Sequence, residues 1–422
     1  MSKIRAVVLG YGNRGARYSD YSVKHPDELE IVAVAEPVAN RREHAAQLHQ
    51  LPQDRVYADW HEVAQQPKMA DFAIITTQDN MHLEPALAMI EKGYDLLLEK
   101  PMATTPAECK QITEAAERKG VRVIVCHVLR FASFWTTLKS IIDSGDIGKV
   151  MSIVHMENVG NRHQSHSFVR GNWRKTSEST PMILAKCCHD TDLIQWLIGK
   201  PCKKVQSFGS LTHFTHDHKP KDAPARCTDG CPHADTCFYN AVKLYYDDKN
   251  NTWFRSVAAN TVTNPSDEAV MEALRTGPYG RCVYDCDNDV VDHQVVNMEF
   301  EDMTTASLSM NAFNKGGRFI HVFGSAGEIT MGEGNWFNVY SFADCQTKQV
   351  PIDTVGNSIA SGHGGGDVGI MIDTVNYFGK GIASPSICDV RMSYLSHLIA
   401  FAAEESRLGG TVVDLDEYSA RW

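Results

Sequence analysis

The feature that most constrains the fold is a glycine-rich turn that directly follows a short apolar run. The run covers residues 4–9, and three glycines follow it in the spacing GxGxxG. The first glycine suits a tight turn, the second lets the backbone approach a pyrophosphate, and the third allows a helix to pack closely on the strand. Free N–H groups at the start of that helix favour phosphates. The sequence therefore predicts a dinucleotide-binding βαβ unit, whose cofactor-binding residues are Gly10, Tyr11, Gly12, Asn13, Arg14 and Gly15.

A carboxylate after the second apolar run bears on which dinucleotide binds. Residues 29–35 form that run, and Glu36 follows it, 21 residues after Gly15. An acid in this place accepts hydrogen bonds from ribose hydroxyls and repels a 2′-phosphate. The pattern therefore favours NAD. NADP stays open, because Arg41 and Arg42 lie nearby in sequence and an arginine there holds a 2′-phosphate.

The overall composition limits the partners of the chain. Its 422 residues are enough for two or three domains. The net charge is −11, with no basic block, which argues against nucleic acid or an anionic membrane as the main partner. No apolar run is long enough to cross a bilayer. The chain enters its first strand without a signal peptide, so we expect a cytoplasmic protein.

The order of predicted elements indicates two domains. Strand and helix patterns alternate over residues 1–130, with near-continuous apolar strands, and later strands alternate apolar and polar residues. We predict an α/β fold with an N-terminal doubly wound parallel (Rossmann) sheet and a C-terminal α+β domain, residues 131–422, with a mostly antiparallel sheet. Residues of about 212–286 are polar, turn-rich and rich in cysteine, and are interpreted as an insertion with little core. Strands are predicted at 70–77, 95–98, 121–126, 150–158, 294–300, 305–310 and 318–323, and helices at 82–92, 106–119, 134–144, 374–378 and 392–405.

An ordered set of motifs resembles the Gfo/Idh/MocA oxidoreductases. The matching segments are 10–15, 76–82, 99–101, 145–150, 189–192 and 324–327. The resemblance covers most of the chain except the cysteine-rich insertion. It implies a sugar- or cyclitol-handling enzyme that uses NAD or NADP. It further implies cofactor contacts from Thr77, Asp79, His82, Glu99, Lys100 and Arg130.

Lys100 is the first candidate catalytic residue. It follows a buried strand and precedes Pro101, which places it at the edge of the sheet where ligands bind. There an ammonium group holds a substrate hydroxyl or helps to move its proton. In enzymes of this family the corresponding lysine lies near nicotinamide and substrate. The alternative is an exposed lysine with no catalytic role.

The second candidate site lies on a predicted helix. Lys186 and His189 share one helix face, and apolar residues behind them anchor the helix. Many family members have an aspartate four residues before this histidine, whereas this chain has Ala185. We expect His189 to accept a proton from a sugar hydroxyl, with Lys186 and Lys100 stabilising the alkoxide. The alternative is a structural histidine.

Substrate contacts are expected from donor-rich segments. Residues 161–174, near the join of the two domains, combine hydrogen-bond donors with aromatic rings that stack on a sugar. A solvated surface loop is the alternative. The predicted substrate-binding residues are His166, Arg170, Trp173, Arg174, Asp190, His293 and His363.

The insertion carries closely spaced cysteines. Cys227, Cys231 and Cys237 need one more ligand for a tetrahedral zinc site or an iron–sulfur cluster. We name Cys286 as the fourth ligand, with Cys282 and His233 as alternatives. A structural zinc is favoured, because an insertion with little core gains order from a metal.

Three functions fit these patterns. The leading hypothesis is an NAD-dependent dehydrogenase that acts on a ring hydroxyl of a sugar, cyclitol or glycoside. The alternatives are a redox-neutral, NAD-dependent glycosidase, which some relatives exemplify, and a non-catalytic nucleotide sensor. The paired carboxylates of ordinary glycosidases are not identifiable. An antiparallel sheet with one open face also predicts a homodimer or homotetramer.

Overall fold

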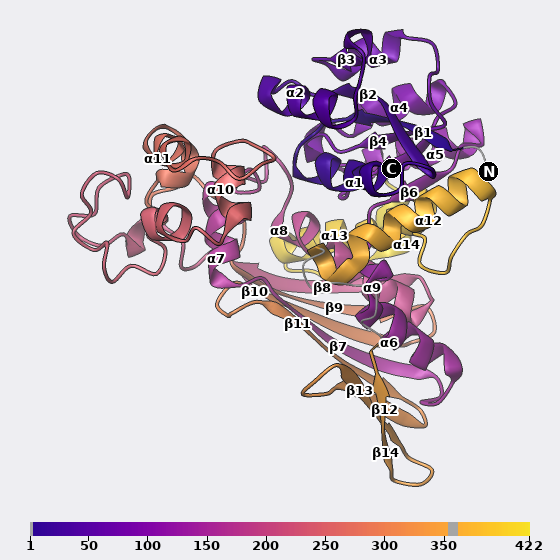
Figure 1. Ribbon diagram of the computed structural model, residues 1–422. Coiled ribbons are helices and arrows are strands. Elements are labelled where there is room, and N and C mark those ends of the chain that lie inside the picture. The colour runs from indigo at the N-terminus through magenta and orange to yellow at the C-terminus, as the bar shows by residue number, and fades with distance from the viewer. Residues whose placement is uncertain (1–2, 353–361) are drawn as a thin grey trace.

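The structure is a computed structural model, and it describes residues 3–352 and 362–422. Its first domain is built on a six-stranded parallel sheet in the order β3-β2-β1-β4-β5-β6, which confirms the predicted doubly wound sheet (Figure 1). The strand order reverses between β1 and β4, and ligands bind outside the carboxyl ends of the strands at such a point. The strands are β1 Ile4–Leu9, β2 Leu29–Ala35, β3 Val56–Tyr57, β4 Phe72–Ile75, β5 Asp95–Leu98 and β6 Val123–Val125.

Local sequence signals explain where the helices of this domain begin and end. In α5, Thr105 and Glu108 form a reciprocal capping box at the N-terminus, and Gly120 ends the helix in a left-handed conformation. The predicted helix over 106–119 is therefore confirmed. The helices are α1 Asn13–Lys24, α2 Ala39–Leu48, α3 Trp60–Gln65, α4 Leu83–Glu91 and α5 Pro106–Lys119.

A helix from late in the chain completes the first domain. Helix α12, Gly366–Lys380, packs against the first sheet, and the ring of Phe378 lies 5.3 Å from that of Phe72. Ile370 and Met371 are buried in the same apolar cluster. The sequence-based division assigned every residue after 130 to the second domain, whereas α12 belongs to the packing of the first.

The second domain is built on a nine-stranded sheet in the order β14-β13-β12-β11-β7-β10-β9-β8-β15. Only β7 and β10 pair in parallel in the described sheet, so the prediction of a mostly antiparallel sheet is confirmed. The strands are β7 Val150–Asn158, β8 Cys202–Ser210, β9 His293–Phe300, β10 Thr305–Asn311, β11 Gly317–Gly324, β12 Gly327–Met331, β13 Trp336–Ser341, β14 Thr347–Pro351 and β15 Val413–Asp414. The helices are α6 Ser133–Ser144, α7 Asn161–His163, α8 Met182–Ala185, α9 Cys188–Ile198, α13 Val390–Gly409 and α14 Leu415–Ser419.

The two faces of this sheet differ in what covers them. Helices α6, α8, α9 and α13 lie on the face toward the first domain (Figure 1). On that face, β7 presents Ile153, His155 and Glu157, all of them buried. The other face carries exposed apolar side chains, including Val154 of β7 and Phe319 of β11.

The insertion forms a separate lobe beside the two domains (Figure 1). It contains α10 Thr252–Ala258 and α11 Asp267–Thr276, and two small apolar clusters bury residues such as Leu274 and Phe214. The expectation of little core is therefore wrong, because aromatic side chains spread over the segment come together. The lobe also contacts the first domain, where Arg41 donates a hydrogen bond to Asn260.

None of the helices in the described part of the chain combines the length and apolar character that spanning a membrane requires.

Candidate functional site

The glycine turn has the geometry that a pyrophosphate requires. Gly10 has a φ of +89°, and a Cβ there would lie 2.6 Å from the carbonyl oxygen of Thr76. A Cβ on Gly15 would lie 2.1 Å from the carbonyl oxygen of Gly10. A Cβ on Gly12, by contrast, would have one described neighbour within 4 Å, a guanidinium nitrogen of Arg41 at 3.7 Å. The first and third glycines are thus demanded by packing, and the second leaves open space beside the loop.

Glu36 lies next to this loop, as the sequence predicts. Its carboxylate accepts hydrogen bonds from the backbone N–H of Tyr11, at 2.6 Å, and of Val38, at 3.0 Å. The Tyr11 side chain is buried, with its hydroxyl 2.9 Å from Nε2 of His49, so Tyr11 supports the turn from within the domain. The acid and the glycine turn therefore form one unit.

An ionic network joins the glycine loop to the C-terminal helix α12. Arg14 donates to Glu99 at 2.7 Å and to Asp367 at 2.7 Å. His363 lies 3.0 Å from the same Asp367 carboxylate. Burial raises the pKa of Asp367, but the hydrogen bond with His363 and the positive charge of Arg14 outweigh it and hold that pKa well below its usual range. This network brings together the predicted residues Arg14, Glu99 and His363.

Lys100 reaches from the first domain to the second. Its Nζ donates to the backbone carbonyl of Ala185, at the end of α8, over 3.0 Å. The Lys100–Pro101 peptide is cis, and Nδ1 of His82 lies 2.8 Å from the Pro101 carbonyl oxygen. The carbonyl oxygen of Thr77 lies 3.2 Å from the other ring nitrogen of His82, Nε2. His82 therefore ties the turn after β4 to the peptide that follows Lys100.

His189 is surrounded by cationic and imidazole side chains. Its ring lies 5.8 Å from that of His127 and 6.0 Å from that of His363. No described residue forms a hydrogen bond with its buried Nδ1. Burial, and then the nearby charge of Lys100, lower the pKa of His189 well below its ordinary value. The ring is therefore neutral near pH 7 and able to accept a proton.

A carboxylate of the sheet compensates for the alanine at position 185. Lys186 forms an ion pair with Glu157 of β7 at 3.3 Å, and Arg318 of β11 pairs with the same carboxylate at 2.8 Å. Arg318 also donates to Asp190 at 2.7 Å, and His155 lies 2.7 Å from that carboxylate. Asp190 has no exposed surface and holds Arg318 in place, and its direct contact with substrate stays a prediction.

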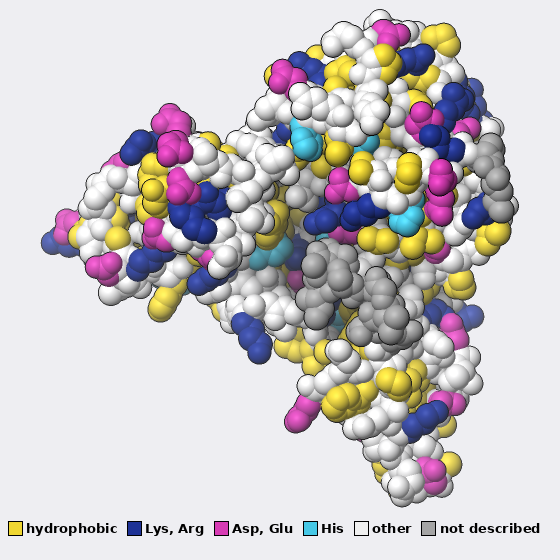
Figure 2. Space-filling view, in the orientation of Figure 1, with side chains coloured by type: hydrophobic (Ala, Val, Ile, Leu, Met, Phe, Trp, Pro, Cys, Tyr) yellow, Lys and Arg dark blue, Asp and Glu magenta, His cyan; other side chains and the backbone are white. Residues whose placement is uncertain are grey.

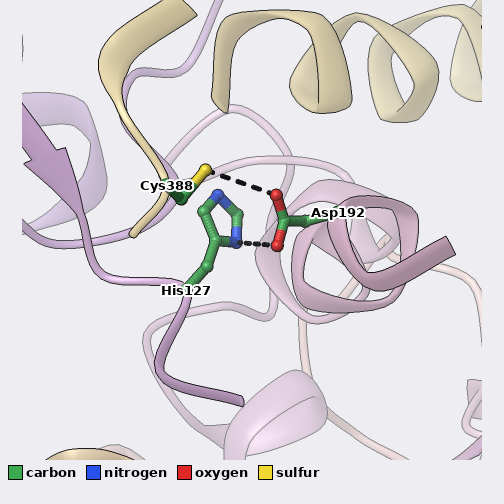
Figure 3. Close-up of side chains that lie close together, drawn as sticks. All are labelled: His127, Asp192 and Cys388. Atoms are coloured by element: carbon green, nitrogen blue, oxygen red, sulfur yellow. Dashed lines mark hydrogen bonds and ion pairs between the residues drawn. The ribbon is translucent and has the colours of Figure 1, made fainter. Parts of the chain in front are cut away.

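The helix that carries His189 is fixed by a second buried ion pair. Arg130, in the short helix η3 Val128–Phe131, donates to both oxygens of Asp192 at 2.7 and 2.6 Å. His127 and Cys388 contact the same carboxylate (Figure 3). Arg130 is 1 % exposed and serves here as the partner of Asp192, and its direct contact with the cofactor stays a prediction.

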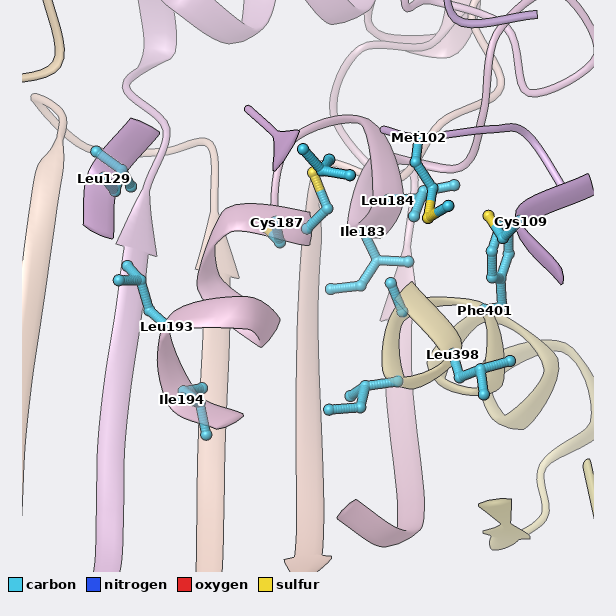
Figure 4. Packing of buried hydrophobic residues seen from close by; sticks show 14 of the residues in the cluster. Met102, Cys109, Leu129, Ile183, Leu184, Cys187, Leu193, Ile194, Leu398 and Phe401 are labelled. Atoms are coloured by element: carbon cyan, nitrogen blue, oxygen red, sulfur yellow. The ribbon is translucent and has the colours of Figure 1, made fainter. Parts of the chain in front are cut away.

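Apolar packing behind α9 completes this support. Ile183, Leu193 and Leu398 belong to one continuous core of side chains from α8, α9 and α13 (Figure 4). Ionic and histidine side chains gather on the other side, in the hollow where the two domains and the insertion meet (Figure 2). The site is therefore held on rigid elements.

Two residues of the predicted substrate segment, which precedes the insertion in sequence, are buried against residues of the insertion. His166, in the π-helical turn η4 Gln164–Arg170, stacks on Phe254 at 4.1 Å and is 1 % exposed. Arg170 has no exposed surface and donates to the carbonyl oxygens of Arg281 and Tyr239. Distant aromatic and backbone partners thus bury both residues, and their role as substrate ligands stays a prediction.

The remaining predicted substrate residues also have structural partners. Trp173 donates to Asp79 at 2.8 Å, so these two predicted residues link the domains. Arg174 pairs with Asp287 at 2.8 Å. His293 pairs with Asp292 and belongs to the sheet face opposite the one that carries Glu157. The register therefore places His293 on the other side of the sheet from Glu157, and its contact with a substrate stays a prediction.

The predicted metal ligands are partly corrected. Cys227, Cys231, Cys237 and Cys282 line one small pocket. Cys286 does not line it, and its thiol donates to the carbonyl oxygen of Cys282 at 3.2 Å. Cys282 thus replaces Cys286 as the fourth cysteine, because the backbone pairing of Arg226 with Arg281 brings Cys227 and Cys282 together.

Four polar residues of the site were missed from the sequence. They are His127, Glu157, Arg318 and Asp367. The strand pattern could have identified Glu157, because it lies on the same face of β7 as the residues two and four positions before it, which are buried. A charged residue on a buried strand face needs a charged partner.

Comparisons with known proteins agree with this geometry. Residues 4–127 match the family model described as oxidoreductase family, NAD-binding Rossmann fold, and residues 139–347 match its C-terminal alpha/beta domain. The chain is 28 % identical over 207 residues to inositol 2-dehydrogenase of Salmonella typhimurium, which covers 49 % of this chain and 57 % of that protein. It is 24 % identical to the putative oxidoreductase YteT of Bacillus subtilis, over 72 % of this chain and 71 % of that protein.

A solved structure shows the same fold over nearly the whole chain. Scyllo-inositol dehydrogenase from Lactobacillus casei, solved with NAD(H) and scyllo-inositol, superposes with a TM-score of 0.67 at 15 % identity, covering 98 % of this chain and 99 % of that one. The chain spans just over half the length of the inositol 2-dehydrogenases that it matches. With both domain models matched in order, the chain belongs to the Gfo/Idh/MocA oxidoreductase family.

Proposed function

We propose that the protein is an NAD-dependent dehydrogenase that acts on a ring hydroxyl of a cyclitol or sugar. The observation that carries this proposal is the reach of Lys100 from the glycine-turn domain to Ala185, beside the neutral ring of His189. Relatives named as inositol dehydrogenases support a cyclitol as the first substrate to test. The coarse assignment, an oxidoreductase of this family, does not depend on the choice of substrate.

The roles of the side chains follow from their charge and position. The glycine turn and Glu36 would hold NAD, which would supply the hydride acceptor. His189 takes the hydroxyl proton, and the ammonium groups of Lys100 and Lys186 stabilise negative charge on the oxygen. Glu157, buried beneath Lys186, orients that lysine.

The cofactor assignment rests on Glu36. Its carboxylate lies against the glycine turn, where it would repel the 2′-phosphate of NADP. Arg42 donates to the carbonyl oxygen of Glu36, and Arg41 contacts Asn260, so both arginines have partners. We therefore propose NAD as the preferred cofactor.

A turnover assay tests the function. Inositols, free sugars and aryl glycosides are each mixed with NAD or NADP, and both NADH formation and aglycone release are followed. Stoichiometric NADH from a cyclitol or sugar supports the dehydrogenase. Aglycone release with only catalytic NAD overturns it in favour of a redox-neutral glycosidase. Absence of turnover together with tight NAD binding favours a sensor.

The pH profile tests His189. Because the pKa of His189 lies below the ordinary 6.5 of histidine, kcat/KM is expected to fall on the acid side with a midpoint below about pH 6.5. As pH falls through that pKa, the ring is protonated and no longer accepts a proton. His189→Gln should remove this acid limb as well as lower the rate. A limb that persists unchanged in the variant assigns the base to another residue.

The exposed sheet face supports self-association. Val154, Phe208 and Phe319 are all more than a third exposed, and they lie on neighbouring parts of one face. We propose that a second copy of the chain covers this face in a homodimer or a homotetramer. A single-chain mass in light scattering contradicts this.

A further inference from the structure

The insertion holds a small pocket whose walls are rich in sulfur. The pocket has a volume of about 20 Å³, which is room for one water-sized particle. Cys227, Cys231 and Cys237 come from one turn-rich segment. Cys282 joins them through antiparallel backbone pairing, in which Cys227 N–H donates to Gly280 and Cys282 N–H donates to Ala225.

A buried cation without a counter-charge lines the same pocket. Arg170 has no exposed surface, and no carboxylate in the described part of the chain pairs with it. One of its terminal nitrogens, Nη1, is buried without a hydrogen bond, and Nη2 lies 4.0 Å from the sulfur of Cys227. An isolated buried charge is strongly destabilising unless an opposite charge lies close. Thiolates in the pocket would supply that charge.

We propose that Cys227, Cys231, Cys237 and Cys282 bind one zinc ion as thiolates, with Arg170 as the buried counter-charge. Four thiolates and Zn²⁺ carry a net charge of −2, which the guanidinium reduces to −1. The four thiol protons leave to solvent on binding. A pocket of about 20 Å³ suits a single ion rather than an iron–sulfur cluster.

The sulfur atoms approach one another further when zinc binds. In the described residues, the ligand atoms of His127, Asp192 and Cys388 all lie within 4.8 Å of one another. The sulfur atoms of the four insertion cysteines lie farther apart than this. The group of His127, Asp192 and Cys388 does not need a cation, because Arg130 already occupies both oxygens of Asp192. In the insertion, the four thiolates move toward the zinc ion as it binds, and the pocket becomes smaller.

Zinc at this point fastens three segments that are distant in sequence. Arg170 precedes the insertion, the first three cysteines lie in its first half, and Cys282 lies near its end, before β9. The site therefore sets the position of the insertion relative to the sheet. It is a structural site, and no step of the proposed reaction depends on it.

Metal analysis of the full-length protein tests the assignment, with Cys282→Ser and Cys286→Ser as a matched pair. We expect about one zinc per chain in the unmutated protein and in Cys286→Ser, and loss of zinc in Cys282→Ser, as required by a tetrahedral four-thiolate site. Absence of metal from the unmutated protein, or unchanged zinc in Cys282→Ser, overturns the proposal. Loss of zinc in Cys286→Ser alone restores Cys286 as the ligand. Iron with equimolar sulfide shows a cluster instead.

Cobalt substitution of the unmutated protein gives a second test that does not depend on the variants folding. Co²⁺ bound by four thiolates produces intense sulfur-to-metal charge-transfer absorption. A spectrum that shows only oxygen or nitrogen ligands overturns the assignment. Neither readout requires turnover, so failure of the proposed dehydrogenase activity leaves this test unaffected.

Discussion

Replacing Lys100 by methionine is expected to lower kcat/KM for the proposed cyclitol or sugar oxidation at least about a hundredfold. Methionine keeps most of the side-chain length but removes the ammonium group that donates to Ala185 and that we propose stabilises the reacting oxygen. Steady-state kinetics with the substrate identified by the turnover assay measures this loss. Because Glu36 and the glycine turn are unchanged, NAD affinity should fall much less than kcat.

Lys110→Met is the matched control for this variant. Lys110 lies on α5 of the same domain and forms only an exposed pair with Glu114, 3.8 Å away. Its replacement should leave the rate near that of the unmutated protein. If Lys100→Met also retains near-normal turnover, Lys100 is not part of the catalytic machinery.

Replacing Asp192 by alanine is expected to lower the free energy of unfolding by about 3–5 kcal/mol. The change leaves the guanidinium of Arg130 buried, at 1 % exposure, without its carboxylate partner. It also removes the partner of the Cys388 thiol. Urea denaturation measures the loss.

Asp143→Ala is the control for the stability measurement. Asp143 pairs with Lys139 on the surface of α6, and more than half of its side chain is exposed. A surface pair of this kind contributes about 0–1 kcal/mol. A similarly small loss in Asp192→Ala would show that Arg130 finds another partner or water, and that the pair does not fix α9.

The sequence predicted those features of the site that depend on residues close together in the chain. The glycine turn and Glu36 depend on a strand, a turn and a helix that are adjacent in the chain, so spacing alone locates them. Lys100 follows a short apolar strand for the same reason. The prediction of one helix for Lys186 and His189 held only for His189, which lies in α9, because α8 ends at Ala185 and Lys186 lies in the turn between the two helices.

The residues whose partners the sequence did not predict contact segments that are distant in the chain. The partner of Arg130, Asp192, lies 62 positions away, and the aromatic rings around His166 lie about 80 or more positions away. Hydrogen-bond donors near a domain join resemble a substrate loop in sequence, whether or not a later segment buries them. Choosing Cys282 over Cys286 likewise required the backbone pairing with residues near Cys227.

The return of α12 to the first sheet has a consequence for the independence of that domain. Ile370, Val375 and Phe378 are buried with side chains of β1 and β4, and Asp367 pairs with Arg14 beside the glycine turn. A fragment that ends near residue 130 would expose this apolar surface. Arg14 would keep its ion pair with Glu99 and lose the one with Asp367. We therefore expect the nucleotide-binding domain to be less stable without α12, a helix that is made only after most strands of the second domain.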